Sequence, residues 1–233
     1  MDQRCPKICY QKKEDGLTVT ACYGIDGQIY LPDELRGEPI TAIAPYAFSD
    51  REPEEGDLCW MEEGAEDLSG LHRLNMEAVT EIRLPSGVRE IGRYAFYRCR
   101  NLRKLVLSNA LREIGGGALT GCRIREVEIH FANGEQSALP SILDEMRYRI
   151  LARLYYQEGK TAQVLFPEHY EEAVENTPAR ILYTSHHGAG GYYRQCFYNR
   201  ALDYGKYDEL LPRAIAELSL IHISEPTRLA LIS

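Results

Sequence analysis

The chain has 233 residues, 44% of them apolar, and a formal net charge of −8, which suits one large domain or two small ones. No stretch approaches the ~20 apolar residues of a transmembrane helix, and the start, MDQRCPKICYQKKEDG, lacks the apolar run of a signal peptide, so we expect no membrane association. The seven cysteines are an odd number without disulfide-like spacing, which favours reduced thiols and a cytoplasmic location.

The first repeated element lies near the N-terminus, in GQIYLPDELRGEPITAIAPYAF, where Ile29, Leu31, Ile40, Ile43 and Phe48 are the main apolar positions. The same pattern returns at Ile91, 48 residues after Ile43, which is two repeats of 23 plus two. Residues 50–70 are therefore either an acidic insertion or a degenerate repeat within the series.

The net negative charge belongs to this segment. Residues 50–67, DREPEEGDLCWMEEGAED, hold nine acidic residues and one arginine, and the rest of the chain sums to zero. Such a charge run is typical of a solvated insertion. A docking site for a basic partner or for Ca²⁺ is the alternative, although the spacing fits no Ca²⁺-binding loop. Because no basic stripe exists, we do not expect nucleic acid as a partner.

The pattern L-x-x-L-x-L then occurs three times, at 79–84, 102–107 and 124–129. Alternation at the end of each segment predicts a short strand with one buried face. One repeat cannot bury its apolar face alone, so we predict that the repeats stack with these strands parallel and adjacent. The inward positions, which should be buried, are Ile82, Leu84, Leu105, Leu107, Val127 and Ile129.

Two further residue types recur with the repeat. Gly92 and Gly115 share a register, and we expect them to serve a turn that requires a positive φ. Cys99 and Cys122 would lie about 5 Å apart on adjacent repeats. That separation allows a disulfide, but two small core residues are the preferred interpretation.

The outward positions alternate in charge and are the candidate binding residues. One register places Lys104 between two acids, and such cross-strand pairs contribute about 0.2–1 kcal/mol each. Arg83 and Glu126 are expected to be exposed. The six candidates are Glu81, Lys104 and Glu126 in one register and Arg83, Val106 and Glu128 in the other.

The segment VTEIRLPSGVREIGRYAFYRCRNLRKLVLS resembles the repeat of the BspA-type leucine-rich repeat family, with LP, IG-x-x-AF and Cys-x-x-L in place. DGLTVTACYGIDGQIYLPDELRGEPITAIAPYAF resembles the N-terminal repeat of that family, so the resemblance covers residues 16–131. It implies an α/β fold, a leucine-rich-repeat parallel β-solenoid, with protein binding or adhesion as the function and no catalytic residues. We therefore expect a non-enzymatic protein–protein interaction scaffold that needs no cofactor.

Residues 138–217 are predicted to form a small α+β segment. Alternation over 148–156, the turn QEGK and the run TAQVLF predict a β-hairpin. A helix is the alternative, because Leu143, Met146, Ile150 and Leu154 also match helical spacing. FPEHYEEAVENTP, residues 166–178, predicts a helix, because Pro167 stands at its start and acids fill its early turns. Two short helices are expected after it. The segment is rich in tyrosine but carries 9 basic and 11 acidic residues, which argues against stacking on nucleic-acid bases.

One constellation there suggests chemistry instead. SHHGAGG, with Ser185, His186 and His187 on a glycine-rich loop, could bind a metal, with Glu168, His169 or Cys196 as further ligands. Cys196 and one histidine could also form a nucleophile–base pair. A metal-binding or hydrolytic site is therefore the alternative to the scaffold, and a polar loop is the simpler interpretation.

The last residues have a different origin. LSLIHISEPTR, residues 218–228, matches the translation of a transposon-end adapter used in DNA sequencing libraries. We expect residues 218–233 to be a non-native tail and the natural protein to continue differently after Glu217.

Overall fold

The computed structural model describes residues 5–52, 57–61, 70–168, 170–176, 181–187 and 203–210, together with Cys196 and Pro212. The predictions for residues 218–233 and for the loop 188–191 lie outside these residues. Among the described residues, no helix is long and apolar enough to cross a membrane.

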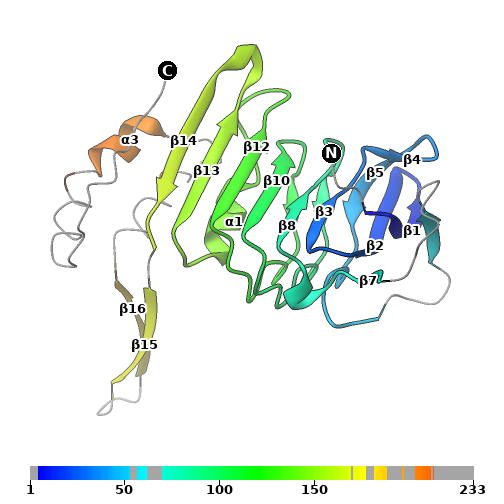
Figure 1. The fold of residues 1–233 in the computed structure, drawn as a ribbon. Helices are drawn as coiled ribbons and strands as arrows, with labels where there is room; N and C mark the ends of the chain where they lie inside the picture. Colours follow the sequence, from blue (N-terminus) through cyan, green and yellow to red (C-terminus); the bar gives the residue numbers. More distant parts are fainter. Residues whose placement is uncertain are drawn as a thin grey trace.

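The repeats form a stack of parallel strands from β3 to β13, and Figure 1 shows these strands side by side with the antiparallel β14 at the end of the sheet. Leu105 lies in register with Ile82 and Val127, and the six inward positions predicted to be buried are all buried. The predicted parallel solenoid is therefore confirmed. Its sheet contains β3 (Gln28–Tyr30), β8 (Glu81–Arg83), β10 (Lys104–Ser108), β12 (Glu126–His130), β13 (Ile150–Tyr155) and the antiparallel β14 (Thr161–Phe166).

A second sheet receives one short strand from each repeat, so that β9 follows β8 and β11 follows β10 along the chain. Its N-terminal part is a β-hairpin, and one buried cluster contains apolar side chains from both sheets. This sheet contains β1 (Lys7–Lys13), β2 (Gly16–Gly24), β4 (Glu34–Leu35), β5 (Glu38–Ile43), β6 (Leu58–Met61), β7 (His72–Arg73), β9 (Glu90–Ile91) and β11 (Glu113–Ile114).

The repeated cysteines tie each repeat to the one before it. The Cys99 thiol donates to the Phe48 carbonyl oxygen at 3.4 Å, and the Cys122 thiol donates to that of Phe96 at 3.2 Å. Both thiols are buried and free, which confirms that they are core residues rather than a disulfide. Burial raises the pKa of Cys122 to about 12 and that of Cys99 further, so both stay protonated and able to donate.

The repeated glycines have a different role from the one expected. Neither Gly92 nor Gly115 has a positive φ, so the turn explanation is wrong. A Cβ atom on Gly92 would lie 2.3 Å from the Pro45 nitrogen, and one on Gly115 would lie 2.4 Å from the Arg93 nitrogen. The glycines are required because the backbones of successive repeats approach closely at this point.

We expect Gly115→Ala to lower the free energy of unfolding by about 1–3 kcal/mol, because the new methyl group must displace the neighbouring backbone. Gly116→Ala is the matched control, since a Cβ there meets nothing within 4 Å and φ is not positive. The control should leave stability unchanged or raise it by about 0.4–1 kcal/mol. Urea unfolding of both variants tests this, and equal stabilities would contradict the close-approach explanation.

The acidic segment is an insertion and not a degenerate repeat. β3 pairs directly with β8, and Ile43 of β5 pairs directly with Ile91, so no strand stands between them. Part of the segment instead adds β6 to the outer edge of the second sheet, antiparallel to β1. The degenerate-repeat alternative assumed that one further layer lies between Ile43 and Ile91, because 48 residues is about twice the repeat length. In the structure, the layers that contain these two residues are adjacent.

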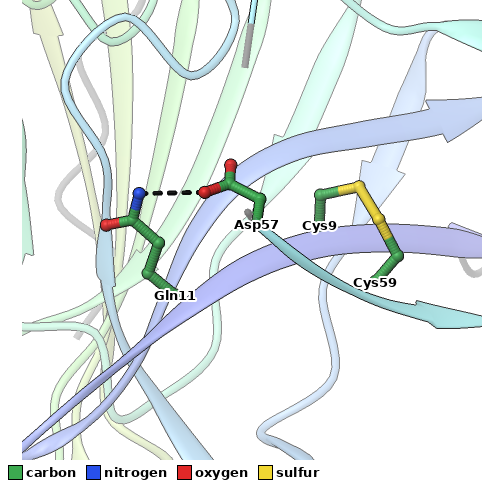
Figure 2. Close-up of a disulfide and its surroundings, with 4 residues drawn as sticks. All are labelled: Cys9, Gln11, Asp57 and Cys59. Carbon is green, nitrogen blue, oxygen red and sulfur yellow. Dashed lines mark hydrogen bonds between the residues drawn. A yellow bond between two sulfur atoms is a disulfide. The ribbon is translucent and has the colours of Figure 1, made fainter. Parts of the chain in front are cut away.

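A disulfide fastens this insertion to the N-terminal strand, as Figure 2 shows. Cys9 and Cys59 lie opposite each other on β1 and β6 with their Cα atoms 4.2 Å apart, and Gln11 donates to Asp57 at 2.9 Å beside them. The expectation that every thiol is reduced is therefore wrong. It relied on sequence spacing, which cannot reveal a pair 50 residues apart.

The C-terminal segment partly follows the sequence patterns. The predicted hairpin is confirmed as β13 and β14, and β13 extends the parallel sheet by pairing with β12, beyond residue 131. A short helix, α1 (Leu139–Glu145), precedes it. Farther on, Asp203 accepts a hydrogen bond from the Lys206 N–H at 2.9 Å and caps the helix α3 (Tyr204–Glu209).

The helix predicted over residues 166–178 is wrong. Residues Tyr170–Asn176 form β15, which pairs antiparallel with β16 (Ile181–His187) along the full length of both strands. Proline and acidic residues near the start favoured a helix locally, but β16 supplies strand-pairing partners for residues 170–176. Tertiary pairing of this kind overrides a local helix preference.

Candidate binding surface on the parallel sheet

The outer face of the parallel sheet carries side chains in regular rows. Strand pairing aligns Gln28, Glu81, Lys104, Glu126 and Leu151 in one row, because alternate residues of a strand point to the same face. The second row contains Tyr30, Arg83, Val106, Glu128 and Arg153. The sheet thus brings the six candidate residues together on one surface.

Lys104 is the centre of a charge cluster on this surface. Its ammonium nitrogen lies 3.2 Å from a carboxylate oxygen of Glu128, 3.5 Å from one of Glu126 and 3.9 Å from one of Glu81. Glu126 also pairs with Arg153, and His130 lies 2.8 Å from Glu128. The prediction placed Lys104 between two acids, and the structure adds Glu128 as a third.

The cluster changes the protonation equilibria of its members. Partial burial opposes the charge on Lys104, but the three carboxylates outweigh it, so the pKa of Lys104 is raised. Burial also works against the charge of Glu128, and the hydrogen bonds from His130 and Lys104 more than compensate, so the pKa of Glu128 is lowered. Both groups therefore stay charged at neutral pH.

The stability of the protein should depend on pH through Glu128. Because its folded-state pKa lies below the ordinary value of 4.5, its contribution is present above pH 4.5 and is lost as the pH falls through the lowered value. We expect Glu128→Gln to lose less stability than the wild type between pH 6 and pH 3. Urea unfolding at several pH values measures this, with the exposed Glu113→Gln as control. Parallel curves for wild type and Glu128→Gln would contradict it.

Two candidate residues are less accessible than expected. Val106 is only 3% exposed, so it cannot contribute much contact area to a partner. Glu126 was expected to be exposed, but its side chain is only 25% exposed, because Lys104 and Arg153 both pair with it. Arg83 is exposed as predicted.

The sheet also adds surface residues that the repeat pattern alone did not indicate. The His130 and Tyr155 rings stack with centroids 4.9 Å apart, and the Arg83 guanidinium lies 5.3 Å from the centre of the Tyr30 ring. Arg153 and Tyr155 belong to β13, whose alternation was visible in the sequence. The missing information was that β13 pairs with β12 and so joins the same face.

Among the described residues, the structure does not bring the parts of the alternative chemical site together. Ser185, His186 and His187 lie on strand β16 rather than on a loop, where His186 pairs with Glu171 of β15. Cys196 is buried, and burial raises the pKa of its thiol, which leaves it protonated and a weak nucleophile. Within the described ranges, no three His, Cys, Asp or Glu residues gather in a way that could hold a metal ion.

Comparison with known families agrees with the strand pairing. Residues 74–139 match the family described as BspA type leucine rich repeat region, with six copies. The matched region is similar to BspA-type leucine-rich repeats. It contains β8, β10 and β12 and hence all six candidate residues of the leucine-rich-repeat surface.

Comparison with solved structures and curated proteins adds little. A crystal structure of a leucine rich repeat protein from T. pallidum is 20% identical, over 51% of this chain and 67% of that chain, with a TM-score of 0.26. The comparison with curated proteins gave no significant match. The fold assignment rests on the strand pairing and on the leucine-rich repeat match.

Proposed function

We propose that this leucine-rich-repeat scaffold is a non-enzymatic protein-interaction module that presents the outer face of its parallel sheet to a partner. The observation that carries the proposal is the alignment of side chains in two rows across five parallel strands. Repeat solenoids offer extended surfaces of this kind, and their size suits a protein partner better than a small molecule.

The surface is well ordered before any partner arrives. Lys104 is held by three carboxylates, and Arg153 is held by Glu126. Fixed side chains lose less conformational entropy on binding, so more of the contact energy contributes to affinity. The charges of the central cluster largely neutralise one another. The cluster therefore offers a partner a fixed arrangement of side chains rather than a strong net electrostatic attraction.

We therefore expect residues at the edges of the Lys104 cluster to supply most of the binding free energy. Arg83 is exposed over the Tyr30 ring, and the His130 side chain is 52% exposed beside Tyr155. Arginine and aromatic residues dominate binding energy in many protein interfaces. These four residues flank the Lys104 cluster on two sides, which favours a partner that spans several strands.

The test is affinity capture with purified wild-type and variant proteins from a lysate of the source cells, followed by titration of each identified protein. Arg83→Glu and Tyr155→Ala should each weaken a genuine partner by tenfold or more, because hot-spot truncations cost at least ~1.4–2 kcal/mol. Arg112→Ala, an exposed arginine beside β11, is the matched control and should bind as the wild type does. A partner that binds all four proteins equally would mean that the sheet face is not the interface.

A further inference from the structure

A second feature of the surface is a hollow of about 500 Å³ at the edge of the sheet from which β10, β12 and β13 start. Three arginines line it, Arg100, Arg123 and Arg147, together with Glu145 and Tyr148. We call it the arginine pocket. In Figure 1 these strands start at the end of the sheet opposite the turn that joins β13 to β14.

The repeat itself places the first two arginines. Arg100 directly follows Cys99, and Arg123 directly follows Cys122, the two buried cysteines that donate to the preceding repeat. Equivalent residues of adjacent repeats lie about 4.8 Å apart in the direction of stacking. Arg147 precedes β13 in the next layer, so arginines from three successive layers line one hollow. The Arg147 guanidinium also donates to the Asp144 carbonyl oxygen at 2.7 Å.

The pocket is strongly positive for a chain with net charge −8. Arg100 and Arg123 are exposed, and within the part of the chain that the structure describes neither has a carboxylate at ion-pair distance. Glu145 also lines the hollow, and its carboxylate accepts a hydrogen bond from the Leu119 N–H at 2.9 Å. Arg125 lies 4.7 Å from the centre of the Tyr148 ring and adds another cation.

We propose that the arginine pocket binds a short acidic segment of a partner protein. The proposal rests on the proposed interaction function and names the class of partner. Guanidinium groups bind carboxylates through paired N–H donors, and those of Arg100 and Arg123 on adjacent layers, with Arg147 beside them, offer directional donors rather than a diffuse charge. Carboxylates on the same side of an extended peptide are spaced about 6.6–7 Å apart, so two of them fit within the ~10 Å that three layers span.

An acidic peptide is favoured over a nucleic acid by the rest of the molecule. A long polyanion would extend beyond the hollow and meet a chain whose net charge is −8. Nucleic-acid binding needs a basic stripe along which many phosphates are neutralised. The basic region here is local, and its volume suits a few residues of a peptide.

The experiment is a fluorescence anisotropy titration of a labelled six-residue peptide of alternating glutamate and glycine against the full chain. The same peptide with glutamine in place of glutamate is the ligand control. We expect the acidic peptide to bind and the glutamine peptide not to bind, with affinity falling as salt is raised. Arg123→Gln and Arg100→Gln should each weaken binding at least tenfold, whereas Arg112→Gln should bind as the wild type does. Both targets are exposed, and a melting curve of each variant confirms that it is folded.

Several results would overturn the proposal. These are no binding of the acidic peptide by the wild type at millimolar concentration, equal binding of the glutamine peptide, or equal affinities of Arg123→Gln and Arg112→Gln. Tighter binding of inorganic phosphate, or of a single-stranded oligonucleotide with the same charge, would identify a phosphate site instead. If the peptide fails while a captured partner still depends on Arg83, the arginine pocket proposal fails and the proposed function stands.

Discussion

Leu105→Ala is expected to lower the free energy of unfolding by about 2–5 kcal/mol, because it removes a fully buried side chain at the centre of the stack. Leu105 lies between Ile82 and Val127, each in register with it and each also fully buried. The adjacent layers are linked by backbone hydrogen bonds, so they cannot close the resulting cavity without losing those bonds. The cost should therefore include a cavity term in addition to the lost burial.

Urea unfolding of the purified variant measures the loss, and a thermal melt should show it as a fall of at least several degrees. Arg103→Ala is the matched control, since this exposed residue lies two positions earlier, and it should stay within about 0.5 kcal/mol of the wild type. A Leu105→Ala variant as stable as the control would mean that the inward face of β10 is assigned incorrectly.

Loss of the disulfide is the second change with a large expected effect. Cys59→Ser should lower the free energy of unfolding by about 2–4 kcal/mol under oxidising conditions, because the bond closes a loop of 50 residues. The link also holds β6 on β1, where the two strands pair over only four residues, Lys7 to Tyr10 with Met61 to Leu58. Without it, only this short pairing offsets the entropy lost when the insertion is ordered against β1.

Reductant provides the control for this prediction, since wild type and Cys59→Ser should become equally stable once the bond is reduced. Alkylation of the denatured wild type, followed by mass measurement, should label five thiols before reduction and all seven after it. Seven labelled thiols before reduction would show that Cys9 and Cys59 are not bonded.

Much of the solenoid could be predicted from the sequence, because buried positions must be apolar and they recur at regular intervals along the chain. Leu105 and Leu107 alternate with outward residues, and the same alternation returns 22–23 residues earlier and later. Each layer needs the same inward positions, so the register of β8, β10 and β12 followed from comparing layers. The partial neutralisation of Lys104 by its neighbours followed from the same register.

Other features were visible in the sequence, but their meaning was not. Gly92 and Gly115 recur with the repeat, yet the reason is the approach of a neighbouring backbone, which no local pattern reveals. Arg100 and Arg123 follow the repeated cysteines in the same way, and this spacing could have indicated the arginine pocket. The third arginine, Arg147, lies outside the repeat and joins them only in the folded chain.

The sequence by itself determined the repeat, its inward face and the stacking of its central layers. Only the tertiary structure decided that β3 adjoins β8 across the insertion, that β13 extends the sheet, that Cys9 meets Cys59, and that residues 170–176 form a strand. The physical reason is that periodicity records which side chains are buried, and burial is a local property repeated in every layer. Pairing between distant segments produces no periodic pattern in the sequence. The entropic cost of closing a loop rises only slowly with its length, so many distant segments are almost equally possible partners.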